Sequence, residues 1–324
     1  MVLSNKGKGI SLRDFLAGVV ISTLFLIFSG MSPLSASLLL FIAPLPIFYY
    51  YTKLGRNHGL LLVLATLLIS FSTLEALNRG AYVPLLCLFT SLGVILAEIV
   101  KKKVSIEITI LASVAVFTIP LLVLIAYLTI KAGEAPWRLM EPYMVNAILE
   151  SVQHYSEMGV PTEQVTLLKD NARKIAVFFI RILPALGIVS IALCSWLNLL
   201  AARMIFNRRN LDFPDFGDLA GWKSPEKLVW ILISSGAMLL IPDDRFHYVG
   251  LNLLIICLFV YLLHGLAIVS FFFRKKNVPV FLRTLFYVLL IFQQMFILPV
   301  IAAGLFDLWI DFRKFNKKTS DSAA

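Results

Sequence analysis

Residues 175–206 decide the fold, because they form one long apolar run, IAVFFIRILPALGIVSIALCSWLNLLAARMIF. A helix needs about 20 apolar residues to cross the hydrocarbon core of a bilayer, and this run exceeds that length. Arg181 is the charged residue inside the run, whereas Arg203 lies close to its end. Polar and apolar residues do not alternate, so the run predicts a helix and not a barrel strand.

Runs of this kind recur from Leu12 to Trp309. Hydrophobic residues make up 59% of the 324 residues, and the mean hydropathy is +0.87, which no water-soluble fold of this size would carry. We therefore predict an all-α, polytopic transmembrane helical bundle with about eight or nine spans. The candidate spans are Leu12–Gly30, Pro33–Tyr51, Gly59–Leu74, Tyr82–Val100, Ile106–Ile130, Ile175–Phe206, Leu228–Ile241, Tyr248–Phe273 and Phe281–Ile310.

A polar connection divides the spans into two groups. We predict an N-terminal membrane bundle over residues 1–130 and a C-terminal membrane bundle over residues 175–311, followed by a basic polar tail over residues 312–324. The connection, residues 131–174, carries apolar residues at helical spacing until Gly159-Val160-Pro161 interrupts the pattern. It predicts a helical hairpin on the extracytoplasmic face, which is either a packed connector or a lid over a substrate site.

The charge distribution indicates the orientation of the chain. The net charge of +10 would suit a nucleic-acid partner, but the basic residues lie beside apolar runs, as the positive-inside rule expects. We therefore predict a cytoplasmic N-terminus and no nucleic-acid partner. Nine spans would place the tail outside, although its basic residues favour the cytoplasm. The span count can fail at the short segment Leu228–Ile241, or in the last run, where Gln293, Gln294, Pro299 and Gly304 can bend or break the helix.

Polar residues inside the spans are candidate functional residues, because ionisable groups in hydrocarbon usually face a cavity or a partner. Arg181 either reaches the outer interface with its long side chain or binds an anionic group. Gln293, Gly304 and Asp307 follow spacings that place them on one helix face. That face serves either helix packing or the coordination of a cation or substrate.

The expected span Tyr248–Phe273 contains two further polar candidates. Asn252 and His264 are 12 residues apart, which is about 120° around a helix, so they do not point at one ligand unless the helix bends. His264 precedes Gly265, so a packed, hydrogen-bonded histidine is the alternative to a ligand-binding one. The candidate substrate-binding residues are Arg181, Gln293, Asp307, Asn252 and His264.

Motifs for common catalytic sites are absent from the sequence. It contains no GxxxxGK[ST] phosphate loop, no HExxH and no GxSxG. The three cysteines, Cys87, Cys194 and Cys257, lie in apolar runs without a CxxC pair. We expect no enzymatic activity, no cofactor, no metal site and no disulfide.

Several short motifs resemble those of a known family. They are Phe213-Pro214-Asp215, Trp222-Lys223-Ser224-Pro225, Asn252, His264-Gly265-Leu266, Gly304-Leu305-Phe306-Asp307 and Asp311-Phe312-Arg313-Lys314. With them the chain resembles the YybS-like family of bacterial polytopic membrane proteins, whose membrane core is similar to the substrate-binding subunits of energy-coupling-factor transporters. The resemblance implies a multi-pass protein of the bacterial inner membrane, with a small-molecule ligand and separate energising membrane proteins as partners.

The expected function is therefore that of a transport-type, small-molecule-binding membrane subunit. The alternative is a non-transporting scaffold or regulatory membrane protein that recruits partners through its loops. A membrane enzyme that acts on lipid is a third reading, for which the scattered polar residues offer no catalytic constellation.

Overall fold

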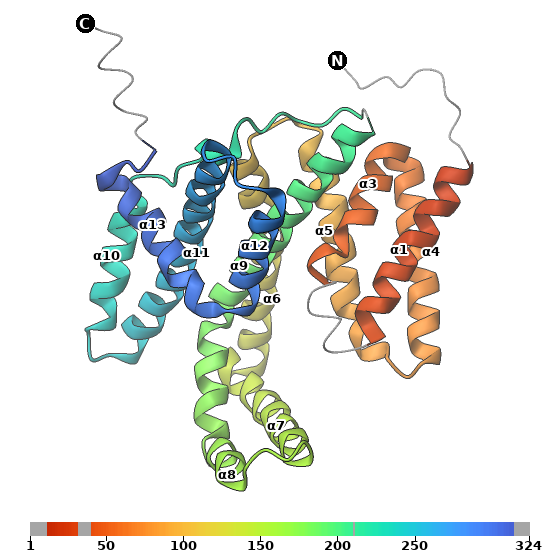
Figure 1. Ribbon diagram of the computed structural model, residues 1–324. Coiled ribbons are helices and arrows are strands. Elements are labelled where there is room, and N and C mark those ends of the chain that lie inside the picture. The colour runs from red at the N-terminus through yellow and green to blue at the C-terminus, as the bar shows by residue number, and fades with distance from the viewer. Residues whose placement is uncertain (1–11, 32–39, 210, 314–324) are drawn as a thin grey trace, which may run out of the picture. The chain divides into compact units, whose positions relative to one another are not determined.

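The structure is a computed structural model that describes residues 12–31, 40–209 and 211–313. Within these ranges it contains helices and no strand (Figure 1). Six helices are long and apolar enough to cross a bilayer, or seven if one bent pair counts as a span. The prediction of an all-helical membrane protein is therefore confirmed. The six are α1 (Leu12–Met31), α4 (Arg56–Ala76), α5 (Val83–Val100), α6 (Ile106–Ala132), α9 (Ala172–Arg208) and α11 (Asp244–Lys275).

The other expected spans correspond to shorter helices. The span expected at Pro33–Tyr51 overlaps α3 (Pro44–Leu54), which continues three residues beyond it. The first residues of the expected span lie outside the described ranges, as does the tail beyond Arg313. The segment Leu228–Ile241 forms α10 (Leu228–Leu239), which is too short for a full span.

The last expected span is two helices. These are α12 (Val280–Phe292) and α13 (Ile297–Ile310), joined through the short η3 (Gln294–Phe296) and bent by 107°. Gln293 has an extended backbone (φ −111°, ψ 93°), which ends α12. Pro299 lies in the first turn of α13, where its missing N–H costs no helical hydrogen bond. The expectation that Gln293 and Asp307 share one helix face is therefore wrong.

The predicted helical hairpin is present within residues 131–174. It consists of α7 (Pro136–Glu157) and α8 (Thr162–Asp170), which pack against each other. Gly159 adopts a positive φ of 80° in the turn between them, a conformation that glycine tolerates without steric cost. The prediction that this hairpin is extracytoplasmic stays a prediction.

The helices form two compact units. Unit 1 comprises Met1–Leu121 and Ser190–Phe216, and unit 2 comprises Leu122–Val189 and Gly217–Ala324, so the boundaries fall inside α6, inside α9 and at Gly217. In unit 1, α1, α3, α4 and α5 pack together. Gly18 of α1 lies so close to Leu62 and Tyr50 that a larger side chain would not fit.

Unit 1 gathers ion pairs at one end of its helices. Lys53, near the end of α3, lies 2.8 Å from Asp14 at the start of α1. Glu98, near the end of α5, accepts hydrogen bonds from Tyr51 at 2.6 Å and from Lys101 at 2.8 Å. These contacts place the start of α1 beside the end of α3, and the end of α3 beside the end of α5.

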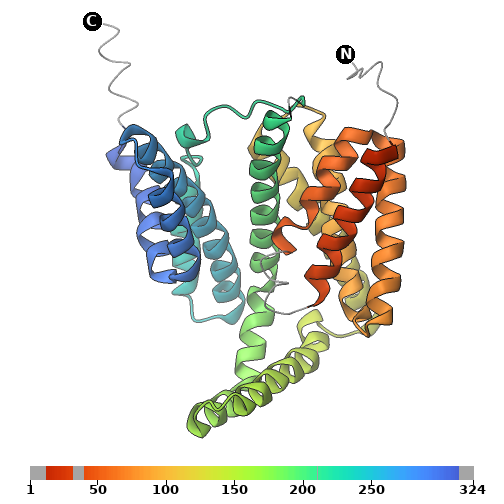
Figure 2. The ribbon, with the colours of Figure 1, turned by 45° about the vertical axis from the view of Figure 1, so that its right-hand side comes forward.

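Unit 2 is centred on α11, which packs against both α10 and α13 (Figure 2). Two glycines allow α11 and α13 to approach at backbone distance. A side chain on Gly265 would overlap the carbonyl of Val300, and one on Gly304 would overlap the carbonyl of Tyr261. Close approach through small residues is a usual way for membrane helices to associate. It brings the polar residues beside these glycines together.

Candidate functional site

Arg181 stands at the start of a long uncharged stretch of α9. Between Arg181 and Arg203, α9 carries no charged residue over about 20 residues, which is a length of about 30 Å. That length equals the usual thickness of the hydrocarbon core, as the reading of Arg181 as an interface residue requires. This reading stays a prediction.

The neighbours of Arg181 belong to the start of α11. Its Nη1 donates to Asp244 Oδ2 at 3.3 Å, and its guanidinium lies 3.9 Å from the centre of the Tyr248 ring. The Arg181 side chain is 27% exposed and that of Asp244 is 83% exposed, so this ion pair is largely hydrated and contributes little stability. The stacked ring holds the guanidinium in place by a cation–π contact.

Asn252 hydrogen-bonds to two backbone groups in one turn of α9, beside Pro184. Its Nδ2 donates to the carbonyl of Arg181 at 2.8 Å, and its Oδ1 accepts from the N–H of Ala185 at 2.9 Å. An unbroken helix would join these two backbone groups to each other. Pro184 lies between them and disturbs this turn, because its ring clashes with the preceding turn of the helix. Both polar atoms of the Asn252 amide therefore bind the backbone of α9. The side chain joins α11 to α9 and does not face a ligand cavity.

His264 and Asp307 meet in what we call the buried cluster, which also contains Ser224 and Arg313. His264 Nδ1 lies 3.0 Å from Ser224 Oγ, and His264 Nε2 lies 3.1 Å from Asp307 Oδ2. Arg313 Nη2 donates to Asp307 Oδ2 at 2.9 Å and lies 2.9 Å from His264 Nε2. All four residues are buried. Trp222 packs edge-on against the imidazole, with 6.0 Å between the ring centres.

Backbone groups add further hydrogen bonds to the buried cluster. Arg313 Nη1 donates to the carbonyls of Ala220 at 2.8 Å and of Trp222 at 3.0 Å. The other oxygen of Asp307, Oδ1, accepts from the N–H of Phe312 at 2.9 Å. The cluster thus joins α11, α13 and the loop that contains η2 (Leu219–Gly221). Because the carboxylate and the guanidinium are buried together, each supplies the counter-charge that the other needs.

The order Ser224–His264–Asp307 resembles a nucleophile relay, but its surroundings do not suit catalysis. A nucleophile must reach its substrate, and Ser224 is only 4% exposed. One proton at most fits on His264 Nε2: either this nitrogen donates to Asp307, or it accepts from Arg313. Arg313 therefore competes for the position that a general base would need. The geometry instead fits a structural tie between three segments.

The two polar centres lie far apart. Asp244 and His264 are 20 residues apart on α11, which is about 30 Å along the helix. The Arg181–Asp244 contact therefore lies about 30 Å along α11 from the buried cluster, and Asn252, 12 residues before His264, lies about 18 Å from it. No single ligand contacts both centres. Of the expected site residues, the structure brings together His264 and Asp307, places Arg181 beside Asn252, and leaves Gln293 at the bend between α12 and α13.

Sequence reasoning missed Ser224 and Arg313 as partners of the buried cluster. Both belong to motifs that carry the family resemblance, which was the available signal. Ser224 lies in a loop, where a serine carries no signal of a buried partner. Arg313 follows the end of the last expected span, where a cation usually only anchors the helix at the membrane interface. Their pairing depends on the close approach of α11 and α13, which no local pattern reports.

The loop before η2 carries an aspartate at every third position, and each of these aspartates forms an ion pair with a basic residue in or beside a helix. Asp212 pairs with Lys103 at 3.2 Å and Asp215 pairs with Arg203 at 3.5 Å, both within unit 1. Within unit 2, Asp218 accepts two hydrogen bonds from Arg274 Nη2, at 2.6 and 2.9 Å. Part of the positive charge at these helix ends is therefore neutralised by aspartates of the same chain.

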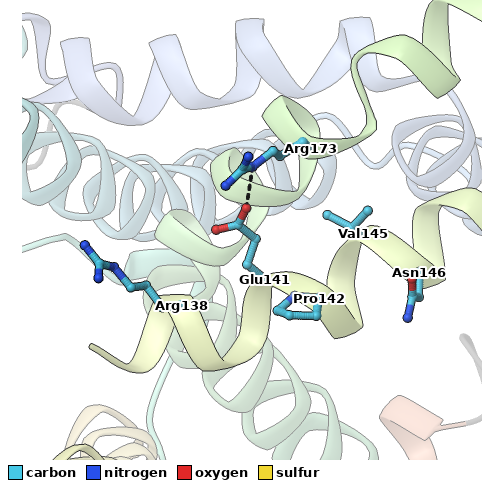
Figure 3. Close-up of a pocket in the computed structure, with 6 residues that line it drawn as sticks. All are labelled: Arg138, Glu141, Pro142, Val145, Asn146 and Arg173. Carbon is cyan, nitrogen blue, oxygen red and sulfur yellow. Dashed lines mark hydrogen bonds and ion pairs between the residues drawn. The ribbon is translucent and has the colours of Figure 1, made fainter. Parts of the chain in front are cut away.

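A concave site lies on the hairpin, where α7 faces the first turn of α9 (Figure 3). The hollow has a volume of about 620 Å³. Arg173 Nε donates to Glu141 Oε1 across it at 2.6 Å. The α7 residues recur at intervals of three and four, so they share one helix face. The lining residues are Arg138, Glu141, Pro142, Val145, Asn146 and Arg173.

Comparison with known proteins places the chain in a family. The model of a family described as Predicted membrane protein (DUF2232) matches residues 20–308. The chain belongs to this family. The match covers Arg181, Asn252, Ser224, His264 and Asp307, and ends before Arg313; it supports a multi-pass membrane protein as the coarse assignment. No curated protein and no solved structure matches the chain.

Proposed function

We propose that this member of the DUF2232 family is a non-enzymatic membrane subunit that binds a small molecule for transport. The hollow on the hairpin carries this proposal. Its volume of about 620 Å³ lies within the range of about 300–1,000 Å³ that is usual for small-molecule sites. Pro142 and Val145 offer apolar contact, while the charged side chains and Asn146 offer the few polar groups that fix a ligand's orientation.

The position of the hollow suits the capture of a solute before it crosses the membrane. Arg173 precedes Arg181 by eight residues, so it stands about 12 Å further along α9 from the hydrocarbon boundary. With the N-terminus in the cytoplasm, this end of α9 is extracytoplasmic. The hollow then faces the outside of the cell, as a lid or receptor for an incoming solute requires.

The same orientation gives both ends of the chain a cytoplasmic location. Arg274 at the end of α11 binds Asp218, and Arg313 just after α13 binds the carbonyls of Ala220 and Trp222. The start of α12 and the end of α13 therefore lie at the same end of unit 2, as in a re-entrant hairpin. Nine full spans would place the C-terminal tail outside, whereas an α12–α13 pair that does not cross the membrane leaves the tail in the cytoplasm. A cytoplasmic tail agrees with its basic residues.

Energy for transport would come from separate membrane or nucleotide-binding proteins. The sequence lacks a GxxxxGK[ST] loop, so it has no nucleotide site of that type. Lys102 and Arg208, both in unit 1, are exposed and have no ion-pair partner among the described residues, in contrast to the basic residues of that unit that pair with loop aspartates. These cations are the surface that we propose for partner contact.

Ligand retention tests the proposal. Protein extracted gently from the membrane should carry a small molecule in native mass spectrometry, or should gain thermal stability with one member of a metabolite panel. A ligand present at 100 times its Kd stabilises by about 2.7 kcal/mol, which a melting curve resolves. If no member shifts the melting temperature, while stable protein partners without nucleotide-binding subunits co-purify, the scaffold alternative replaces transport.

A further inference from the structure

We infer that the hollow on the hairpin binds an anionic group, a carboxylate or a phosphate, and that Glu141 occupies the position of that group when no ligand is bound. The inference rests on the proposed function and names the class of its solute. The lining contains two guanidinium groups, Arg138 and Arg173, against the single carboxylate of Glu141. Guanidinium groups match the planar, two-oxygen geometry of carboxylate and phosphate.

The contact between Glu141 and Arg173 is the observation that points to a substitutable anion. The side chain of Arg173 is 80% exposed, whereas that of Glu141 is 22% exposed. Glu141 thus holds an arginine that otherwise extends into water, and the bond of 2.6 Å is that of a charge-assisted contact. An exposed ion pair of this kind is weak, so an incoming anion can displace the carboxylate at little cost.

Arg138 is a second cation in the lining of the hollow. It lies one helical turn before Glu141 on the same face of α7, and it has no ion-pair partner among the described residues. Its side chain extends away from the Glu141–Arg173 pair (Figure 3), so it must swing toward an anion at Arg173 in order to contact it.

Two variants with opposite effects test the inference. Glu141→Gln keeps the shape and removes the competing charge, so the affinity for inorganic phosphate or succinate should rise about two- to fivefold. Replacing both Arg138 and Arg173 by Gln should weaken binding of the same anions about tenfold or more. The matched controls are Glu150→Gln and Lys169→Gln, which change the same charges at exposed positions of the hairpin outside the hollow.

Binding is measured by titration calorimetry on the full chain in uncharged detergent, with glucose and putrescine as neutral and cationic probes. A second arm uses nanodiscs of phosphatidylcholine with or without phosphatidylglycerol. The site binds a lipid headgroup if phosphatidylglycerol raises the melting temperature of wild type but not of the double Arg variant, and if free phosphate abolishes this effect. The site binds a soluble solute if anions bind in detergent alone.

The outcomes separate the inference from the proposed function. The inference is supported if anion affinity is highest in Glu141→Gln, lower in wild type and lowest in the double Arg variant, and if the control variants bind like wild type. Equal anion affinities in all variants, or binding of only glucose or putrescine, overturn the inference and leave a small-molecule-binding protein. Absence of binding by every probe in both arms overturns the inference, and failure of the wider metabolite panel overturns the proposed function.

Discussion

Asp307→Asn should strongly destabilise the protein, because it removes one charge from the buried cluster. Asparagine has nearly the volume of aspartate, so the substitution creates no cavity and isolates the effect of charge. The Arg313 guanidinium would stay buried, without the carboxylate that now accepts its hydrogen bond at 2.9 Å. Removal of one partner from a buried ion pair costs about 3–5 kcal/mol.

The loss of stability appears as a lower melting temperature. For a chain of this size 1 kcal/mol corresponds to about 2–4 °C, so the expected shift is roughly 6–20 °C. The assay heats detergent-solubilised protein and measures the fraction that remains monodisperse by size-exclusion chromatography. Asp311→Asn is the matched control, because Asp311 is only four residues away and its pair with Lys223 at 3.3 Å is partly exposed. Its melting temperature should change by less than about 3 °C.

A double variant separates an electrostatic tie from simple packing. Asp307→Leu combined with Arg313→Met removes both buried charges together and should recover much of the stability lost in Asp307→Asn. A melting temperature for Asp307→Asn within about 2 °C of wild type would falsify the assignment of the buried cluster as a tie between α11, α13 and the loop.

Three further predictions follow from unit 2. Asn252→Leu should cost about 1–3 kcal/mol, seen as a lower melting temperature, because it leaves two backbone groups of α9 without their bridge; an unchanged melting temperature would mean that the bridge is not needed. Gly304→Ala should greatly reduce the yield of folded protein because its new methyl group overlaps α11, whereas Gly236→Ala has open space around it and should not; equal yields would exclude the close approach of α11 and α13. In a variant without exposed Cys87, a cysteine at Lys276 should react with a membrane-impermeant reagent only after the cytoplasmic side is opened, and one at Asp243 should react in intact cells; the reverse pattern would invert the proposed orientation.

The membrane fold could be predicted from the sequence because run length is a local property. The run around Arg181 exceeds the span requirement whatever its neighbours do, and the structure gives it as α9. The bend at Gln293 was only one of several possible faults, because an amide in a long apolar run is compatible with a straight, a kinked and a broken helix. Its direction depends on where the chain returns, and that is set by the contacts of Arg313 with the distant loop.

The candidate site was predicted less completely, because burial and pairing are tertiary properties. The sequence singled out His264 and Asp307 separately, and it offered a packed, hydrogen-bonded histidine as one reading of His264. It did not show that Gly265 and Gly304 face each other and so bring these two side chains within 3.1 Å. The calculated separation of Asn252 and His264 around the helix agrees with their contacts, since Asn252 bonds to α9 and His264 to Asp307.

These contacts move the search for function away from the most buried polar residues. A group whose hydrogen bonds are all made within the protein must break them before it binds a solute, and in a buried site that cost is several kcal/mol. His264, Asp307 and Asn252 are in that position, since each is bound by its own chain. Arg138 is exposed beside a concave surface, so it can bind an anion without such a cost. The hairpin, whose sequence shows the weakest membrane pattern of the chain, is therefore the first place at which to look for a ligand.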